Sequence, residues 1–508
     1  MPHTRTDRRE KSIYRAALWL IIAVYLAIGT LYAIETPAWQ VPDEPAHYNY
    51  VKFIAEHGRL PELQPGDYPA DYLEEIKARR FPSDMSIEPI RYEAHQPPLY
   101  YLTAAFVYRL VDLLPGGRHL LALRLLSLLY GVGALATGCL LIRRLLPHAP
   151  LLALGTVAFA ATLPMHIAMS AAVNSDSLAI WLLSSIVLVV VSPGTRRWTL
   201  RRTAALGLLL GLAFLTKMQS YVGFGVALAA LAWDTLWPGD DRTAPNGRLA
   251  LGRAALMLGV ALAVASPWLL RNIQTYGLDD PLAMARHDTV VEGQLTTREF
   301  LATSGPMMLA WSLAQTTFRS FWGQFGWMGV VLDERIYRAL FLVSTIAGGG
   351  LLLRIARAVR DWRRDRELFS AEMRRGLALL TLWLALTALG YLWWNVKFVQ
   401  HQGRYLFPAL VPIGLAFTVG LREALTRSAQ PVAVALAVGA LALLALGLVT
   451  GDIRAFTTAM LAAASMAIVA GALLERRWTG STLALYYGGM AGFALICLYL
   501  YIVPWLTP

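Results

Sequence analysis

The sequence contains few charged residues and almost no cysteine. Of its 508 residues only 15% are Asp, Glu, Lys or Arg, whereas 56% are hydrophobic, and the mean hydropathy is +0.49. A soluble domain could not bury so much apolar surface, which excludes a soluble protein. Cys139 and Cys497 are the two cysteines, so neither a disulfide framework nor a zinc pattern is present. No nucleic-acid-binding motif is found, and the net charge of +12 indicates contact with anionic lipid headgroups.

The sequence instead has many long apolar runs. Several approach twenty residues, which is about the length that crosses a hydrocarbon core of roughly 30 Å. They predict an all-α polytopic membrane protein with about thirteen transmembrane helices. The predicted spans are residues 16–34, 120–142, 151–171, 177–192, 203–217, 219–237, 250–270, 336–353, 377–394, 405–421, 430–450, 455–474 and 481–503.

The distribution of Lys and Arg predicts the orientation. With the N-terminus in the cytoplasm, more than half of the 45 basic residues lie on cytoplasmic segments, and short external loops nearly lack them. The C-terminus is then external. The apolar stretch 98–113 is short and interrupted by Arg109 and Asp112, so we expect an amphipathic helix in the membrane interface. If 98–113 crossed the membrane instead, the basic loops that follow it would lie outside, against the charge bias.

The predicted spans leave two long external loops, 35–119 and 271–335. The first is rich in Pro, Tyr and acidic residues, and we expect amphipathic juxtamembrane helices near 46–57 and 71–80. We interpret residues 1–508 as one membrane domain. It comprises a module at 16–421, which includes both external loops, and C-terminal transmembrane helices at 422–508.

Polar residues gather at the external ends of the predicted spans. Asp43 and Glu44 follow the first span, and the others are Asp176, Lys217, Arg271, Lys397, His401 and Arg404. Charges at this depth are costly without partners, so their clustering indicates a functional site. The structural alternatives are helix capping by the two carboxylates and interfacial anchoring by the cations.

Transfer of a sugar from a polyprenyl-phosphate carrier would use these residue types. The acceptor hydroxyl needs a carboxylate as base, and the phosphate leaving group needs cations. The acidic pair of Asp43 and Glu44 just outside the first span is where that base would lie, and Glu44 would alternatively orient the acceptor or pair with a cation. Arginine suits phosphate because its planar fork of donors matches the phosphate oxygens, which favours Arg271 and Arg404.

The order of several motifs resembles the GT-C superfamily of integral membrane glycosyltransferases, which includes protein O-mannosyltransferases and lipid A aminoarabinose transferases. The motifs are Pro42-Asp43-Glu44, Gln96-Pro97-Pro98-Leu99-Tyr100-Tyr101, Arg124, Asn174-Ser175-Asp176, Leu215-Thr216-Lys217, Ser266-Pro267-Trp268-Leu269-Leu270-Arg271-Asn272 and Gln402-Gly403-Arg404-Tyr405-Leu406-Phe407-Pro408. The last motif and Asp43-Glu44-Pro45-Ala46-His47 are similar to a large bacterial group of such proteins. Several relatives carry Lys or His directly before the Pro-Pro pair, where this sequence has Gln96 preceded by His95.

The resemblance implies a GT-C-like fold and an inverting glycosyltransferase in the cytoplasmic membrane of a bacterium or archaeon, with an external active site. Its partners would be a polyprenyl-phosphate sugar, an acceptor glycan, lipid or protein, and membrane lipids, without nucleic acid. Asp43 and Glu44 would be catalytic. The donor site would draw on Arg404, Arg271, His401, Lys217, Arg124, His95, Asp176, Lys397 and Tyr405.

Two other functions remain open at this point. One is a transporter or flippase for a lipid-linked glycan, and the other is a glycan polymerase or ligase that uses a polyprenyl-diphosphate donor. No cofactor is required. A divalent metal bound by Asp43, Glu44 and His47 is conceivable, although their spacing is not specific for metal. We expect a monomer.

Overall fold

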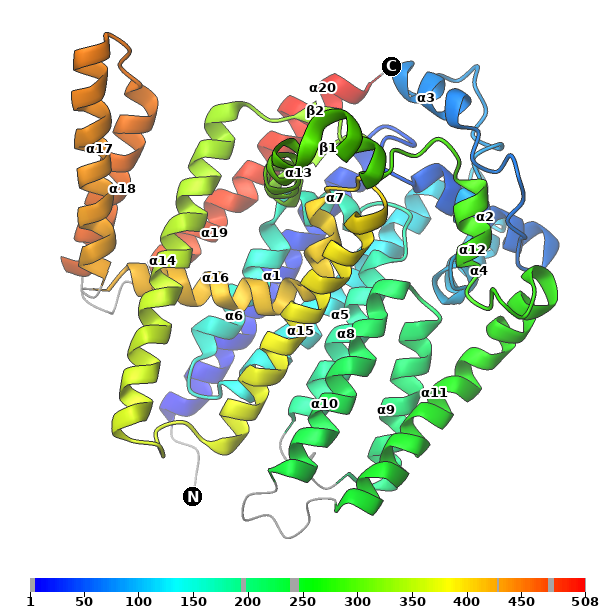
Figure 1. Cartoon of the computed structure of the whole chain (residues 1–508), viewed down its shortest axis with the longest axis horizontal. Coiled ribbons are helices and arrows are strands. Elements are labelled where there is room, and N and C mark those ends of the chain that lie inside the picture. The colour runs from blue at the N-terminus through cyan, green and yellow to red at the C-terminus, as the bar shows by residue number, and fades with distance from the viewer. Residues whose placement is uncertain (1–4, 193–197, 238–245, 427–428, 474–478, 508) are drawn as a thin grey trace.

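The computed structural model describes residues 5–192, 198–237, 246–426, 429–473 and 479–507 and is almost entirely helical (Figure 1). Its long helices run roughly side by side, and shorter elements cover one end of the bundle. The helices are α1 (Arg5–Glu35), α2 (Glu44–His57), α3 (Ala70–Ala78), α4 (Leu99–Asp112), α5 (His119–Leu145), α6 (Pro150–Thr162), α7 (Pro164–Ser170), α8 (Asp176–Val191), α9 (Leu200–Phe214), α10 (Val222–Leu236), α11 (Gly247–Tyr276), α12 (Met284–Val290), α13 (Thr297–Trp322), α14 (Glu334–Arg364), α15 (Ala371–Lys397), α16 (Leu410–Ala424), α17 (Gln430–Thr450), α18 (Ala455–Leu473), α19 (Thr479–Ile496) and α20 (Val503–Leu506).

Short helices of other types and one small sheet complete the fold. The 3-10 helices are η1 (Tyr92–His95), η2 (Met218–Tyr221) and η3 (Gly403–Ala409), and the π-helical η6 (Cys497–Ile502) follows α19. Strands β1 (Gln324–Phe325) and β2 (Val330–Val331) pair antiparallel, with Gln324 opposite Val331.

Nine helices among the described residues are long and apolar enough to cross a membrane, so the protein is a multi-pass membrane protein. The predicted span 151–171 is broken into α6 and α7, which meet at an angle of 67° before Pro164. Helices α8, α9 and α10 have only 15 or 16 residues each. The predicted count of thirteen spans therefore remains a prediction.

The shorter elements gather at the end of the bundle where α1 terminates (Figure 1). Helices α2 and α3 lie where the sequence predicts helices near 46–57 and 71–80, and α4 occupies the stretch 98–113. Helix α13 is absent from the sequence-based assignment. Its pattern is interrupted by Gly305, which adopts a φ of 77° ahead of Pro306, so the helix is kinked there.

A buried ion pair fixes the opposite end of the bundle. Arg375 of α15 donates to both carboxylate oxygens of Asp234 in α10, each at 2.7 Å, and to the carbonyl oxygen of Val190. Trp198 also donates to Asp234, at 3.0 Å. Arg375 lies just before the predicted span 377–394, on a segment expected in the cytoplasm, and the structure buries it against α8 and α10.

The C-terminal helices separate into two parts. Helix α19 packs within the main bundle, where the hydroxyl of Tyr32 in α1 donates to the carbonyl oxygen of Ala494 at 2.7 Å. Helices α17 and α18 form a hairpin that stands at the edge of the molecule beside α14 (Figure 1). The structure thus places α19 with the helices of the predicted module 16–421.

Candidate active site

An ion pair between Asp43 and Arg404 lies at the end of the bundle that the short elements cover. Nη2 of Arg404 donates to Oδ2 of Asp43 at 2.7 Å, and the hydroxyl of Tyr92 donates to Oδ1 at 2.8 Å. The side chain of Asp43 is 26% exposed, whereas that of Arg404 is 6% exposed. The carboxylate is therefore held in a fixed orientation while part of it stays accessible.

The backbone of Asp43 explains this orientation. The residue precedes α2 and adopts a left-handed conformation with a φ of 68°, which is unfavourable for a residue with a side chain. Although Asp43 occupies the N-cap position, its side chain makes no capping hydrogen bond. The capping alternative therefore does not account for Asp43, whose carboxylate points to Arg404 and Tyr92 instead.

Arg404 is positioned by its neighbours in the motif. Its Nε donates to the side-chain oxygen of Gln402 at 2.7 Å. The amide of Gly403 donates to the hydroxyl of Ser320 in α13 at 2.7 Å, and a Cβ at Gly403 would collide with the backbone of Thr317 and Phe321. Only glycine allows this close approach, so the motif places the guanidinium against α13 and opposite Asp43.

A second ion pair lies beside the first. Nζ of Lys217 contacts Oδ1 of Asp176 at 2.5 Å, and both side chains are largely buried. Burial is the largest cause of the lowered pKa of the His47 ring, which is also subject to the charges of Glu93, Lys217, Asp43 and Asp176. Together with the first ion pair these side chains form one electrostatic cluster, in which two cations face three carboxylates.

The electrostatics keep Asp43 ionised. Burial alone would raise the pKa of its carboxyl group, but the charges of Arg404 and His47 and the hydrogen bonds from Arg404 and Tyr92 lower it below the ordinary value. At neutral pH the carboxylate is thus available as a proton acceptor.

Glu44 and Arg124 form a separate, fully buried brace. Arg124 donates to both oxygens of Glu44, at 2.8 and 2.6 Å, and to the carbonyl oxygens of Ala33 and Thr36 at the end of α1. Glu44 also accepts from the amide of Val173 at 3.1 Å. The exposed fractions of the two side chains are 0% for Glu44 and 3% for Arg124. They join α1, α2, α5 and the segment before α8.

The remaining predicted residues lie in other surroundings. Arg271 donates to the carbonyl oxygen of Pro61 and ties the first loop to α11. Lys397 pairs with Asp288, His401 contacts the hydroxyl of Ser312 at 2.9 Å, and Tyr405 donates to Gln400 at 2.5 Å. None of these four hydrogen-bonds to Asp43 in the described part of the chain, although the guanidinium of Arg404 lies 5.4 Å from the ring centroid of Tyr405.

His95 lies in a pair of histidines. Its ring centroid is 4.4 Å from that of His287 in α12, and burial lowers the pKa of each to about 4. Across the described ranges, no three His, Cys, Asp or Glu side chains are arranged to hold a metal ion. Both oxygens of Glu44 bind Arg124, so Glu44 does not converge with Asp43 and His47 on a common metal position.

Three further residues in or near the site are not among those predicted from the sequence. Tyr92 donates a hydrogen bond to Asp43. The sequence feature that could have indicated this residue is its position shortly before the Gln96-Pro97-Pro98 motif. His287 lies in a loop helix that no motif marks. Glu93 is buried, and its Oε2 has no hydrogen-bond partner among the described residues. A buried polar atom of this kind is costly unless a ligand or water satisfies it.

Comparison with known proteins supports the fold. No protein-family model and no curated protein matches the sequence. Two structures of ArnT from Cupriavidus metallidurans match over 94% of this chain at 17% identity, with TM-scores of 0.50 for the form bound to undecaprenyl phosphate and 0.51 for the apo state. They are matched over 76% and 75% of their own length. The chain has the GT-C fold.

A more distant match is AglB, the oligosaccharyltransferase of Archaeoglobus fulgidus, solved with an inhibitory peptide and a dolichol-phosphate. It shares 12% identity over 92% of this chain and 56% of its own length, with a TM-score of 0.45. The matches to ArnT confirm the expected resemblance to the lipid A aminoarabinose transferases at the level of the fold, which is polytopic and helical.

Proposed function

We propose that the protein is an inverting glycosyltransferase that moves a sugar from a polyprenyl-phosphate donor to an acceptor hydroxyl. The observation that carries this proposal is the contact between Asp43 and Arg404, which brings a carboxylate and a phosphate-binding guanidinium together at the end of the bundle. These are the base and the cation that such a transfer needs.

Arg404 can bind a phosphate without leaving Asp43. Its Nε and Nη2 are engaged by Gln402 and Asp43, whereas the hydrogen-bond partner of Nη1 among the described residues is the sulfur of Met169, at 3.7 Å. A thioether is a weak acceptor, and a phosphate oxygen would replace it with a charge-assisted hydrogen bond. Lys217 supplies the second cation close by.

The chemical step follows from this arrangement. The acceptor oxygen attacks the anomeric carbon while Asp43 takes the hydroxyl proton, and the bond between that carbon and the phosphate oxygen breaks. Polyprenyl phosphate leaves with the bonding electron pair, and Arg404 and Lys217 stabilise its added charge. One displacement inverts the anomeric carbon. Glu93, whose Oε2 lacks a partner among the described residues, would accept a hydrogen bond from a hydroxyl of the sugar.

The surroundings of the pair supply an apolar contact for the lipid. Pro42 and Met169 border both the ion pair and a narrow apolar space of about 20 Å³, which Val41, Met165, Ala168 and Phe325 also line. This space holds no more than one water, so its lining residues would have to separate before an isoprene unit could enter. We place the site on the external face of the membrane, with the N-terminus in the cytoplasm, because of the charge bias of the loops.

The experiment that tests this function uses the purified protein in nanodiscs. A panel of polyprenyl-phosphate hexoses and pentoses is supplied with membrane extract as acceptor, and release of free polyprenyl phosphate is measured. Release from one donor would establish the transferase and name the sugar. Release from diphosphate donors alone would favour the polymerase or ligase. Donor movement between leaflets without release would favour the flippase.

A further inference from the structure

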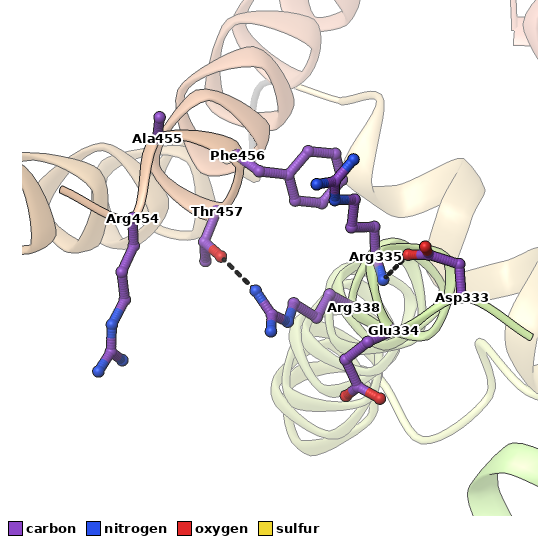
Figure 2. A pocket seen from close by; sticks show the side chains of 8 residues that line it. All are labelled: Asp333, Glu334, Arg335, Arg338, Arg454, Ala455, Phe456 and Thr457. Carbon is purple, nitrogen blue, oxygen red and sulfur yellow. Dashed lines mark hydrogen bonds between the residues drawn. The ribbon is translucent and has the colours of Figure 1, made fainter. Parts of the chain in front are cut away.

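A second basic site lies far from Asp43 in sequence, between α14 and α18. A cavity of about 400 Å³ separates the beginnings of these two helices, and an adjoining space of about 580 Å³ shares Arg338, Arg454 and Thr457 with it. Figure 2 shows Arg335 and Arg338 projecting from α14 toward the residues that begin α18.

The helical hairpin of α17 and α18 leaves this cavity open because it contacts α14 mainly at its other end. There Ala433 and Ile468 pack in a small core with Ile346 of α14. Beside the cavity the contacts are weaker. Arg338 donates to the hydroxyl of Thr457 at 3.4 Å, and the guanidinium of Arg335 lies 6.0 Å from the ring centroid of Phe456. The cavity is therefore a wedge that widens toward the turn that joins α17 to α18.

The wedge has an excess of unpaired positive charge. Within the described residues no carboxylate pairs with the guanidinium of Arg335 or Arg338, and Arg454 has only Asp452 at 3.8 Å, with both side chains exposed. Two acids line the cavity against three arginines, and one of the acids is paired with an arginine outside it. Glu334 pairs with Arg319 at 2.6 Å, and Asp333 accepts from the backbone amide of Arg335.

The position of the wedge indicates which kind of anion it binds. Helices α14, α17 and α18 are all candidate membrane spans, so the wedge opens between transmembrane helices near their ends. The turn before α14 lies on the same side as Asp43, because Trp327 donates to the carbonyl oxygen of Trp39 at 3.0 Å. Leu443 of α17 continues the cavity wall toward the hydrocarbon region. An acyl chain would gain from burial against this apolar side chain, whereas a free anion gains nothing from it.

We infer that the wedge binds an anionic phospholipid from the leaflet that faces the active site. The phosphodiester lies among Arg335, Arg338 and Arg454, and one acyl chain lies along Leu443. A zwitterionic lipid is disfavoured because its own cation would approach three arginines. This site is separate from the proposed donor site, so it does not depend on the proposed function.

The test measures lipid binding to the detergent-purified protein by native mass spectrometry. Phosphatidylglycerol and phosphatidylcholine with identical acyl chains are titrated against the wild type and the variant R335Q/R338Q/R454Q. We expect phosphatidylglycerol to bind the wild type more tightly than phosphatidylcholine, and the variant to lose about tenfold or more in its affinity for phosphatidylglycerol.

The matched control is R360Q/R363Q/R364Q, which removes three arginines from the opposite end of α14 and should keep the preference. Leu443→Trp, which narrows the cavity without changing charge, should weaken phosphatidylglycerol binding as well and guards against misfolding of the triple variant. Equal binding of both lipids, or equal affinity in all variants, would overturn the inference. Binding of inorganic phosphate that depends on the same arginines, without a phosphatidylglycerol preference, would identify a soluble ligand and overturn the lipid assignment.

Discussion

The guanidinium of Arg404 lies 2.7 Å from the carboxylate of Asp43, although 361 residues separate them in the chain. Each of the two is held by a further neighbour, Gln402 for the arginine and Tyr92 for the aspartate. Two side chains fixed in this way keep their geometry before any substrate arrives, which is what an active site needs for electrostatic catalysis.

Loss of the arginine should weaken donor binding. For Arg404→Ala we expect polyprenyl-phosphate sugar to bind about ten to a hundred times more weakly, because a charge-assisted hydrogen bond contributes roughly 1.5–3 kcal/mol. Donor affinity can be measured by microscale thermophoresis in nanodiscs. Arg298→Ala, which removes an exposed arginine of α13, is the control and should bind as the wild type does. An unchanged affinity in Arg404→Ala would remove this residue from the donor site.

The same arginine should influence the pH dependence of activity. Because Arg404, His47 and Tyr92 hold the pKa of Asp43 below its ordinary value of 3.8, the base stays ionised and kcat/KM should not fall on the acid side until below that pH. Removing the positive charge of Arg404 raises the pKa of Asp43, so the acid limb of Arg404→Ala should move to higher pH. An acid limb of the wild type near pH 6 would instead point to a histidine.

Gly403 should tolerate no side chain. In Gly403→Ala the added Cβ would collide with the backbone of α13, so Arg404 would shift away from Asp43. We expect at least a tenfold loss of kcat/KM, since a small misplacement of a catalytic group can cost about a hundredfold in rate. The control is Gly390→Ala in α15, where nothing lies within 4 Å of the new Cβ. Equal activities of the two variants would show that this close approach is unimportant.

The buried brace should matter for stability. In Arg124→Ala the carboxylate of Glu44 would stay buried without its partner, which costs about 3–5 kcal/mol for a pair of this kind. Thermal unfolding in detergent should therefore start at a clearly lower temperature. Lys52→Ala breaks the exposed pair of Lys52 and Glu88 and should lower stability by less than about 1 kcal/mol. Similar melting temperatures for both variants would contradict the proposed role of the brace.

The sequence predicted much of the fold because transmembrane helices are encoded locally, in runs of apolar residues. It also placed Asp43, Lys217 and Arg404 on one side of the membrane, since each lies at the end of a predicted span. The sequence does not predict which of these polar groups bind one another. That Arg124 binds Glu44, or that Arg271 binds the carbonyl oxygen of Pro61, depends on contacts between distant segments, which no local pattern encodes.

The predicted external loop 271–335 shows a second limit of prediction from the sequence. Helix α13 was not expected because Gly305 and Pro306 interrupt its pattern, yet a capping box at Thr296 and Glu299 starts it and η3 packs against it. Without α13 the role of Gly403 could not be predicted, because the residue is selected by the backbone it touches.

The central claim is that Asp43 is the base, and the most direct test is the turnover rate of Asp43→Asn. With the sugar donor named by the panel, single-turnover release of polyprenyl phosphate should fall by about a hundredfold or more, while the donor still binds. Asp71→Asn, which changes an exposed carboxylate of α3 in the same loop, should react at the wild-type rate. A rate for Asp43→Asn equal to that of Asp71→Asn would contradict the account.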